Sequence, residues 1–348
     1  MKTSLRYSTD SEPGITRVTS NGAVAYRHAS GRAVRDPSTL RRIGSLGIPP
    51  AWTEVWICAS TDGHLQATGR DARRRKQYLY HPVWVDERDS NKFDALGSFA
   101  SALPRIRRAV RRDLSMPELT KERVLAAVVQ LMDRTFVRVG GERYRRENGS
   151  FGLTTLRNRH AKANGAVVSL DFRGKSGKRH HVQLEDARVA KVIRHCLDLP
   201  GQVLFQYQDA DELRSISAQD VNDYLRQISG ALITSKDFRT WGATVCVAAR
   251  LAEAGRAETK AEMHRQLREA INAAAKVLGN TPAVCKRSYV APAVFAHYEA
   301  GTTFAVRMID GMRKAECMVA AMLAGRTRRR SISSPADAGR AAVGAALS

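Results

Sequence analysis

The chain has 348 residues, of which 43% are hydrophobic, and its 57 Lys+Arg outnumber its 34 Asp+Glu to give a formal net charge of +23. This length and apolar content exclude a disordered chain and predict two domains, or one large domain, with well-filled cores. Because so large an excess of one charge destabilises a compact state, it predicts a polyanionic partner, with nucleic acid favoured over a membrane surface.

The N-terminal quarter has the pattern of a small β-rich domain. Residues 1–20 are polar and are expected to form a flexible arm. Short runs that alternate apolar with polar residues, bounded by Gly, Pro, Asp and Ser, predict strands from there onward. The expected domain covers residues 21–88, and the polar stretch 86–94, DERDSNKFD, is the expected linker.

Residues 89–325 are expected to form a larger, mainly α-helical domain that also carries a β-hairpin. Residues 166–184 break the helical pattern and predict strand, Gly-containing turn and strand. Two capping boxes predict helix starts, Ser115 with Glu118 and Thr259 with Glu262. The predicted fold class is therefore α+β.

The C-terminal part is expected to contain short helices and a tail. Gly279 stands where the preceding helix should stop, and Thr281-Pro282 then opens a short helix. A last helix is predicted over residues 302–324. Residues 326–348 are basic and then low in complexity, and they are expected to be a disordered tail.

Two motifs fall short of the ligand sites that they suggest. The stretch RGKSGK, residues 173–178, lacks the earlier Gly of a phosphate-binding loop, because position 169 is Ser, and a strand rather than a helix is expected after it. His180 and His181 are neighbours on an expected strand, so they point to opposite faces and are predicted to be structural or phosphate-contacting rather than metal ligands. No metal and no cofactor is expected.

The basic stretch GRDARRRKQYLYH, residues 69–81, combines five Arg/Lys with Tyr78 and Tyr80. On a strand these two tyrosines share one face. The cations can neutralise phosphates, while Gln77 and the tyrosines can reach base edges or backbone oxygens. The alternative is a solvated basic strand with tyrosines packed inward, and this stretch alone does not decide between them.

Four residues in the helical region suit phosphoryl transfer in combination, although each alone is ordinary: Arg138, Lys175, Arg239 and Tyr289. The reaction needs an in-line nucleophile, cations on the non-bridging oxygens and an acid for the leaving oxygen. Two arginines can hold those oxygens, and a lysine can protonate a departing alkoxide. A phenol becomes nucleophilic where guanidiniums favour its phenolate form.

In chain order, these residues lie in the motifs FVRVGGERY, FRGKSGKRHH, KDFRTWGATV and GNTPAVCKRSY. Together with the N-terminal stretch from LRRIGSLGIPPAW to QYLYHPVW, this pattern resembles the type IB DNA topoisomerases in their small bacterial and poxvirus-like form. The resemblance extends over about residues 22–324. It implies a β-rich N-terminal DNA-binding domain and a helical catalytic domain that close as a clamp on double-stranded DNA.

The resemblance also implies the site. Five residues would occupy the catalytic positions: Arg138, Lys175, Arg239, Asn280 and Tyr289. Tyr289 would form a 3′-phosphotyrosine link, Lys175 would protonate the 5′-oxygen, and supercoils would relax before resealing without ATP or metal. Six further residues stand at positions expected to bind DNA: Gln77, Tyr78, Tyr80, Arg143, Tyr144 and Lys236.

Two positions depart from the family pattern. Asn280 stands where the poxvirus-like pattern often has His, and an amide can donate a hydrogen bond but cannot carry charge or move a proton. Arg74 stands where the N-terminal motif usually has Gly, which bears on the turn geometry there.

Two other functions remain open from the sequence. Tyrosine recombinases use similar catalytic residues on a related fold, but they usually carry a helical domain in front, whereas this N-terminal part is expected to be β-rich. A DNA-binding protein without activity would explain the charge but would leave the order of the four motifs to coincidence. Five scattered cysteines without CxxC pairs, and a polar start, predict the reducing cytoplasm. The resemblance implies a DNA-relaxing enzyme that can act as a monomer, associated with the nucleoid.

Overall fold

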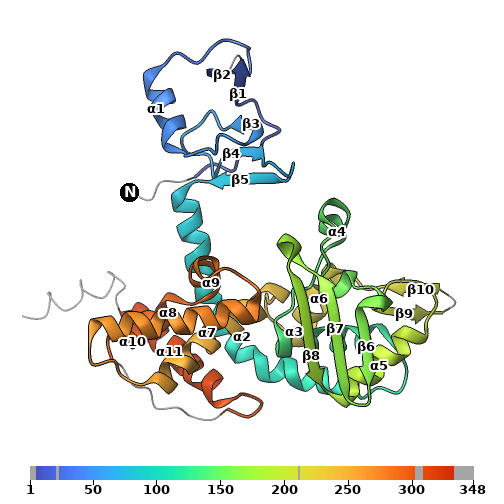
Figure 1. Cartoon of the computed structure of the whole chain (residues 1–348). Coiled ribbons are helices and arrows are strands. Elements are labelled where there is room, and N and C mark those ends of the chain that lie inside the picture. Colours follow the sequence, from blue (N-terminus) through green and yellow to red (C-terminus); the bar gives the residue numbers. More distant parts are fainter. Residues whose placement is uncertain (1–4, 21–22, 211, 302–308, 333–348) are drawn as a thin grey trace, which may run out of the picture. The chain divides into compact units, whose positions relative to one another are not determined.

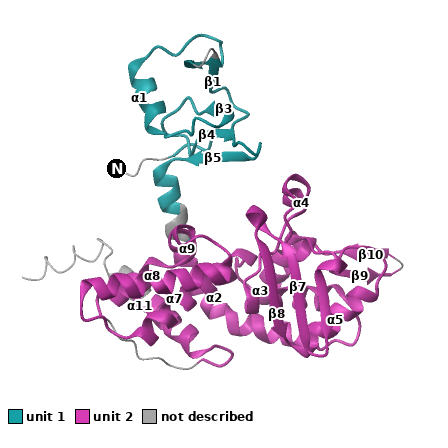
Figure 2. Cartoon of the chain, in the orientation of Figure 1, with its two compact units in different colours: residues 1–92 teal, residues 93–348 magenta. Residues whose placement is uncertain are grey.

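The structure is a computed structural model that describes residues 5–20, 23–210, 212–301 and 309–332 (Figure 1). The chain divides into two compact units, residues 1–92 and 93–348 (Figure 2). Each unit is described below by itself. Within the described residues, no helix combines the length and apolar character that crossing a membrane would require.

Unit 1 is built on a five-stranded antiparallel sheet in the order β2-β1-β3-β4-β5. Its elements are β1 (Ile15–Ser20), β2 (Ala23–Arg27), α1 (Pro37–Ser45), β3 (Thr53–Ile57), β4 (Leu65–Arg70) and β5 (Lys76–Tyr80). Ile15, Ile43 and Ile57 lie at the centre of its core. Asp36 caps α1 by accepting hydrogen bonds from the backbone N–H groups of Ser38 and Thr39.

The expectation of a flexible arm over residues 1–20 is wrong for the part that the structure describes. Residues 15–20 form β1, which pairs with both β2 and β3, and Ile15 is buried. Further upstream, the backbone N–H of Ser8 donates to His64 Nδ1 at 3.0 Å. The polar composition of residues 1–20 concealed this strand. It forms because Ile15, Thr16, Val18 and Thr19 are β-branched and favour extended backbone.

The expected linker at 86–94 is also wrong, because it lies inside a continuous helix, α2 (Pro82–Leu114). This helix runs through the predicted domain border at residues 88–89 and through the border between the two units. The stretch DERDSNKFD is polar but contains no Gly or Pro, so nothing in it stops a helix that begins at Pro82. Polarity alone was therefore a poor sign of a linker.

In its described residues, unit 2 contains the remaining helices and two small sheets. The helices are α3 (Lys121–Thr135), α4 (Glu142–Asn148), α5 (Ala187–Asp198), α6 (Ala218–Ser229), α7 (Ser235–Ala254), α8 (Lys260–Leu278), α9 (Pro282–Tyr289), α10 (Pro292–Glu299) and α11 (Lys314–Ile332). Three short 3₁₀ turns are η1 (Leu153–Thr155), η2 (Asn158–His160) and η3 (Lys175–Gly177). Phe99 of α2 packs edge-on against Phe238 of α7, with ring centroids 5.0 Å apart, in the core of this unit.

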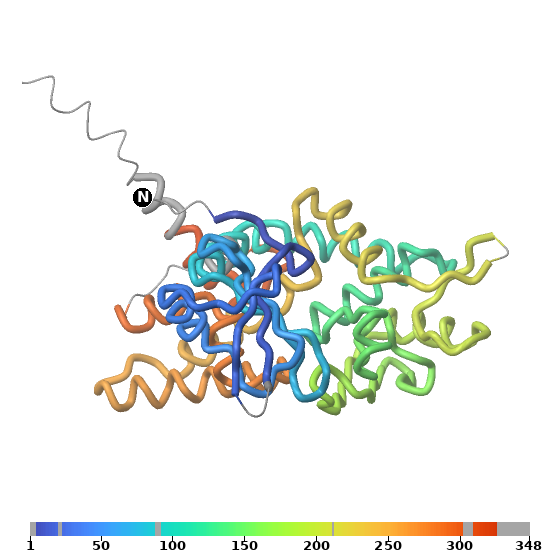
Figure 3. Tube along the Cα trace, turned by 90° about the horizontal axis from the view of Figure 1, so that it is seen from above, coloured from blue at the N-terminus to red at the C-terminus, as the bar shows by residue number. Residues whose placement is uncertain are grey.

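The sheets of unit 2 are both antiparallel. One has the order β6-β7-β8, with β6 (Ala161–Asn164), β7 (Val167–Arg173) and β8 (Arg179–Glu185), so the predicted hairpin is confirmed. Helix α5 packs against β6 and β7, and α3 packs against β8. The second is the hairpin of β9 (Gln206–Asp209) and β10 (Glu212–Ser215), which extends from the edge of the unit in Figure 3.

The two predicted capping boxes have different outcomes. Thr259 caps α8 by accepting a hydrogen bond from the backbone N–H of Glu262, as predicted. The box at Ser115 is wrong, because the next helix begins at Lys121 with Thr120 as its cap. The Ser115 hydroxyl instead donates to the carbonyl of Arg111, at the end of α2.

The C-terminal helices agree with the predictions only in part. Gly279 ends α8 with a φ of +65°, and α9 begins at Pro282, both as predicted. The last helix begins at Lys314 rather than at residue 302, and residues 302–308 lie outside the described part. Helix α11 continues to Ile332, past the predicted start of the tail, and residues 333–348 are not described.

Candidate active site

Tyr289 is the last residue of α9 and is partly buried. The chain just after it is fixed to α7 by Thr244, whose hydroxyl accepts from the N–H of Ala291 at 3.1 Å and donates to the carbonyl of Thr240 at 2.7 Å. The carbonyl of Tyr289 lies 3.2 Å from the same hydroxyl. One turn earlier in α9, Cys285 is fully buried against the core. The phenol therefore projects from a short helix that is held at its C-terminal end.

Arg239 lies beside Tyr289, with its guanidinium carbon 5.2 Å from the centre of the phenol ring. It is on the second turn of α7 and only 5% exposed. The guanidinium donates to the carbonyl of Leu278 at 2.9 Å and to the carbonyl of Phe136. Burial, reinforced by the charge of Arg138, lowers the pKa of Arg239 to about 10.

Arg138 and Asn280 meet in the same region. Arg138 Nη2 donates to Asn280 Oδ1 at 2.7 Å, although the two residues lie 142 positions apart in sequence. Phe136, with a φ of +55°, ends α3 in the left-handed conformation and turns the chain toward Arg138. Asn280 Nδ2 is buried and has no hydrogen-bond partner among the described residues. The amide therefore presents an unused donor on the side away from Arg138.

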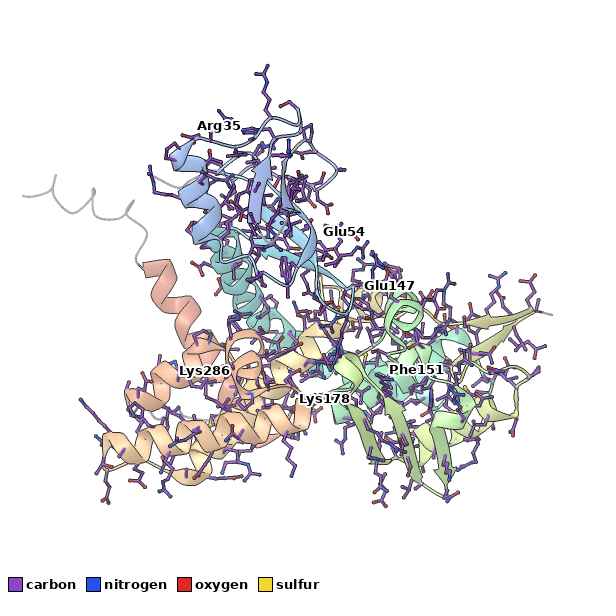
Figure 4. The ribbon with its side chains drawn as sticks, turned by 45° about the horizontal axis from the view of Figure 1, so that its top comes forward. Arg35, Glu54, Glu147, Phe151, Lys178 and Lys286 are labelled. Atoms are coloured by element: carbon purple, nitrogen blue, oxygen red, sulfur yellow. The ribbon has the colours of Figure 1, made fainter. Side chains whose placement is uncertain are left out.

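Lys175 is exposed at the tip of the β7–β8 hairpin, in η3. The tip is closed by hydrogen bonds from Gly174 N–H to the Lys178 carbonyl at 2.7 Å and from Gly177 N–H to the Gly174 carbonyl at 3.1 Å. Figure 4 labels Lys178 on this hairpin and Lys286 on α9. The strand that follows Lys175 confirms that RGKSGK is not a phosphate-binding loop.

The electrostatics of the phenol connect these residues. Burial by itself would raise the pKa of Tyr289, but the positive charges of Arg239, Arg138 and Lys175 outweigh it and bring the pKa below its ordinary value. Of the five residues expected to be catalytic, Tyr289 supplies the phenol, and Arg239, Arg138 and Lys175 lower its pKa. The fifth, Asn280, joins them through its hydrogen bond to Arg138.

The expected DNA-binding residues of unit 2 are exposed, and each lies a few positions along the chain from Arg138 or Arg239. Lys236 is exposed, one turn before Arg239 in α7. Arg143 and Tyr144 are on α4, where the tyrosine is 63% exposed and Arg143 Nε donates to Glu147 Oε1 at 2.8 Å. Glu147 marks this short helix in Figure 4.

The expected DNA-binding residues of unit 1 lie on β5. Tyr78 and Tyr80 share one face of the strand, as predicted, with ring centroids 6.1 Å apart and ring planes 12° apart. Both are more than one-third exposed, so they are not packed inward. Gln77 points to the other face and donates to Asp71 Oδ2 at 2.9 Å. Arg74 has a φ of +58°, the left-handed conformation that the usual Gly at this position adopts without strain.

Sequence reasoning missed the groups that hold this site together. The carbonyls of Phe136 and Leu278 anchor Arg239, and the hydroxyl of Thr244 anchors the end of α9. The sequence predicts that His180 is structural or phosphate-contacting but does not place it beside the catalytic arginines. Its half-buried ring lies close enough to Arg138 and Arg239 for their charges to lower its pKa. Backbone carbonyls have no sequence signature, so no motif could have identified the carbonyls of Phe136 and Leu278 as the anchors of Arg239.

In unit 2, a phenol lies among Arg, Lys and Asn side chains, an arrangement suited to an enzyme that transfers a phosphoryl group. Two family models match the chain: "Bacterial DNA topoisomerase IB, N-terminal domain" over residues 23–71, and "Eukaryotic DNA topoisomerase I, catalytic core" over residues 73–307. The chain belongs to the type IB DNA topoisomerase family.

Curated relatives agree with this assignment. DNA topoisomerase 1B of Acanthamoeba polyphaga mimivirus is 33% identical over 285 residues, which are 80% of this chain and 85% of the viral protein. DNA topoisomerase 1B of Vaccinia virus (strain Western Reserve) is 24% identical over 70% of this chain and 74% of its own length. The mitochondrial DNA topoisomerase I of Rattus norvegicus is 28% identical over 49% of this chain. The protein is thus an isomerase that acts on DNA.

Proposed function

We propose that this topoisomerase relaxes supercoiled duplex DNA through a transient bond between Tyr289 and a 3′-phosphate. The observation that carries the proposal is the placement of the Arg239 guanidinium 5.2 Å from the centre of the Tyr289 ring. A cation there favours the phenolate, which is the nucleophilic form of tyrosine. The same cation can also bind a phosphate that approaches the phenol.

The proposed cleavage step exchanges one phosphodiester for another. The phenol releases its proton to water, the phenolate oxygen bonds to phosphorus, and the bond from phosphorus to the 5′-oxygen breaks. Lys175 gives a proton to that departing oxygen, which becomes a 5′-hydroxyl. The freed strand then rotates, and the 5′-hydroxyl attacks the phosphotyrosine to reseal the DNA. Because the bond energy is retained throughout, the cycle needs no ATP.

Arg138, Arg239 and Asn280 are proposed to stabilise the pentavalent transition state. The two guanidiniums supply the positive charge that a metal ion supplies in many other phosphoryl-transfer enzymes. The Nδ2 group of Asn280 supplies a neutral hydrogen bond. That role is supported by its burial and by its lack of a hydrogen-bond partner in the part of the chain that the structure describes. The hydrogen bond from Arg138 to Asn280 Oδ1 sets the orientation of the amide.

The remaining predicted residues are proposed to bind the duplex away from the reacting phosphate. Tyr78 and Tyr80 present an exposed stacked pair in unit 1, with Gln77 on the same strand. In unit 2, the exposed side chains of Lys236, Arg143 and Tyr144 would contact the duplex. We further propose that the protein acts as a monomer on the nucleoid in a bacterial cytoplasm, which its high positive charge and its bacterial-type N-terminal domain support.

The decisive experiment is relaxation of negatively supercoiled plasmid in EDTA and without ATP. The wild type is expected to relax the plasmid fully under these conditions. Tyr289→Phe removes only the nucleophilic oxygen and is expected to abolish relaxation while leaving DNA binding intact. Denaturing gels should show labelled DNA trapped on the wild type and none on the Phe variant.

Tyr298→Phe provides a matched control, because Tyr298 lies on the neighbouring helix α10 and its hydroxyl contacts Gln266. This variant should keep relaxation activity. A wild type that needs ATP or Mg²⁺, or a Tyr289→Phe variant as active as the wild type, would refute the proposal. Recombinant joints between two DNA sites would indicate a recombinase instead.

A further inference from the structure

His180 lies between the Lys175 hairpin and the turn that precedes Asn280. On β8 it pairs directly with Phe172 of β7, and the two rings stack with centroids 5.2 Å apart and planes 13° apart. Two glycines flank the ring, Gly174 next to Lys175 and Gly279 next to Asn280. The ring therefore touches both chain segments that precede these two residues.

The contacts are close enough that both flanking positions must lack a side chain. A Cβ at position 174 would lie 2.6 Å from His180 Cδ2, and a Cβ at position 279 would lie 2.8 Å from His180 Cε1. Real Cβ contacts are longer than this, so an alanine at either position would force the ring to move. The imidazole fills the space that the two glycines leave open.

The surroundings of His180 favour an uncharged ring. Burial lowers the pKa of His180, and the positive charges of Arg138, Arg239 and Lys178 lower it further. A neutral ring can pack among these cations without adding to their repulsion. The group is thus suited to a packing role inside a site that is already strongly positive.

We propose that His180 is a positioning residue for Lys175: its ring braces the hairpin tip against the Gly279–Asn280 turn and so sets where the lysine ammonium lies relative to Tyr289. This inference rests on the proposed role of Lys175 as the acid for the leaving 5′-oxygen. Without the ring, the exposed hairpin tip loses its packing against the turn, and Lys175 samples positions from which it cannot reach that oxygen.

The adjacent His181 is a matched control. It lies on the same strand with its side chain on the opposite face, is exposed, and pairs through Nδ1 with Asp171 Oδ2 at 2.9 Å. His181→Ala changes the strand by the same number of atoms as His180→Ala. It leaves the ring beside the two glycines untouched.

The test measures single-turnover cleavage on two DNA substrates. One has the ordinary 5′-oxygen at the scissile bond, and the other has a 5′-sulfur there, which leaves as a thiolate without needing an acid. His180→Ala should slow cleavage of the oxygen substrate by about 10- to 100-fold and should spare the sulfur substrate. His181→Ala should cleave both like the wild type.

Lys175→Ala separates this inference from the proposed function beneath it. If Lys175→Ala slows both substrates equally, Lys175 is not the acid, and the positioning role of His180 falls with it. Cleavage through Tyr289 is tested separately, by the relaxation assay with Tyr289→Phe. If Lys175→Ala spares the sulfur substrate and His180→Ala does not, only the role of His180 falls. The double variant should be no slower than Lys175→Ala alone, and additive losses would contradict a shared effect.

His180→Phe guards against a variant that merely unfolds. The phenyl ring keeps an aromatic ring stacked on Phe172 and, being somewhat larger than imidazole, still fills the space between the two glycines, but it has no nitrogen to exchange a proton. It should restore most of the oxygen-substrate rate that His180→Ala loses. Failure of His180→Phe to do so, in a protein whose melting temperature matches that of the wild type, would overturn the bracing role.

Discussion

At the scale of single residues, Asn280 is the member of the site whose chemistry the structure defines most sharply. Its oxygen accepts a hydrogen bond from Arg138, so its nitrogen faces the other way, buried and without a partner among the described residues. An unsatisfied buried donor costs about 1–3 kcal/mol, a cost that a bound phosphate oxygen would remove. This geometry suits a fixed hydrogen-bond donor and gives no means of moving a proton.

Asn280→Ala is therefore expected to slow DNA cleavage by about 10- to 150-fold, the loss of one hydrogen bond to a charged group of about 1.5–3 kcal/mol. Asn280→Asp should be slower still, because the new carboxylate keeps the contact with Arg138 but repels the phosphate. Single-turnover cleavage at saturating enzyme measures both effects on the chemical step.

Asn280→His tests whether the position ever needs a proton. A protonated imidazole can donate as the amide does, so this variant should be active, but its rate should fall as pH rises through the pKa of the new histidine. The amide of Asn280 cannot titrate, so the cleavage rate of the wild type should show no such fall with rising pH. An Asn280→Ala variant as fast as the wild type would exclude any role for the amide in transition-state binding.

At the scale of secondary-structure elements, a buried ionic cluster joins three helices of unit 2. Arg107 of α2 donates to Asp133 of α3 at 2.8 Å and to Glu316 of α11 at 2.9 Å. Glu316 is fully buried, and Arg313 donates to it as well. Asp133 lies near the end of α3, the helix that leads into Arg138. The cluster thus fixes the origin of the loop that carries a proposed catalytic residue.

Glu316→Gln is expected to destabilise the protein by about 3–5 kcal/mol, because it leaves Arg107 partly unpaired in a buried site. Burial would raise the pKa of Glu316, but hydrogen bonds from Arg107 and Arg313 overcome that effect and lower the pKa to about 2. A carboxyl whose folded pKa is depressed contributes stability above its unfolded pKa of about 4.3 and loses it as pH falls toward 2. Urea unfolding at pH 7 and at pH 3 measures both effects.

The loss caused by Glu316→Gln should accordingly be smaller at pH 3 than at pH 7. Glu299→Gln, an exposed change at the end of α10, is a suitable comparison and should alter stability by less than about 0.5 kcal/mol. An equal loss at both pH values would contradict the assignment of a charged, ion-paired Glu316.

At the scale of the whole molecule, the charge of +23 is the dominant property. Each phosphate that a Lys or Arg neutralises releases a condensed counterion, so the affinity for duplex DNA should fall steeply as salt rises. Much of the basic surface is already paired within the protein. Arg214, for example, contacts both Asp209 and Glu212. Net charge alone therefore does not say which cations contact DNA.

Lys236→Ala should reduce the slope of log affinity against log salt by about one, because it removes one of the proposed phosphate contacts. Arg214→Ala also removes one positive charge, but that charge is already neutralised by Asp209 and Glu212. This variant should therefore leave the slope unchanged. Fluorescence anisotropy with one duplex at several salt concentrations measures both. A slope that changes only for Arg214→Ala would place the DNA along the β9–β10 hairpin instead.

The sequence by itself determined the features that depend on local interactions. The cap at Thr259, the stop at Gly279 and the start at Pro282 follow from side chains and backbone preferences within a few residues. The β7–β8 hairpin follows from alternation and a Gly-containing turn. The order of the four motifs indicated the family, and the charge indicated the partner. Each of these signals can be read from one short stretch of sequence, from the order of such stretches or, for the net charge, from the composition of the whole chain.

Only the tertiary structure decided the features that depend on contacts between distant segments. It paired β1 with β3, and it bound Arg138 to Asn280 across 142 residues. It anchored Arg239 on the carbonyls of Phe136 and Leu278, and it placed His180 between two glycines. Backbone carbonyls and the absence of a Cβ leave no mark in a motif. Their effect appears only when folding brings separate segments to within a few ångströms.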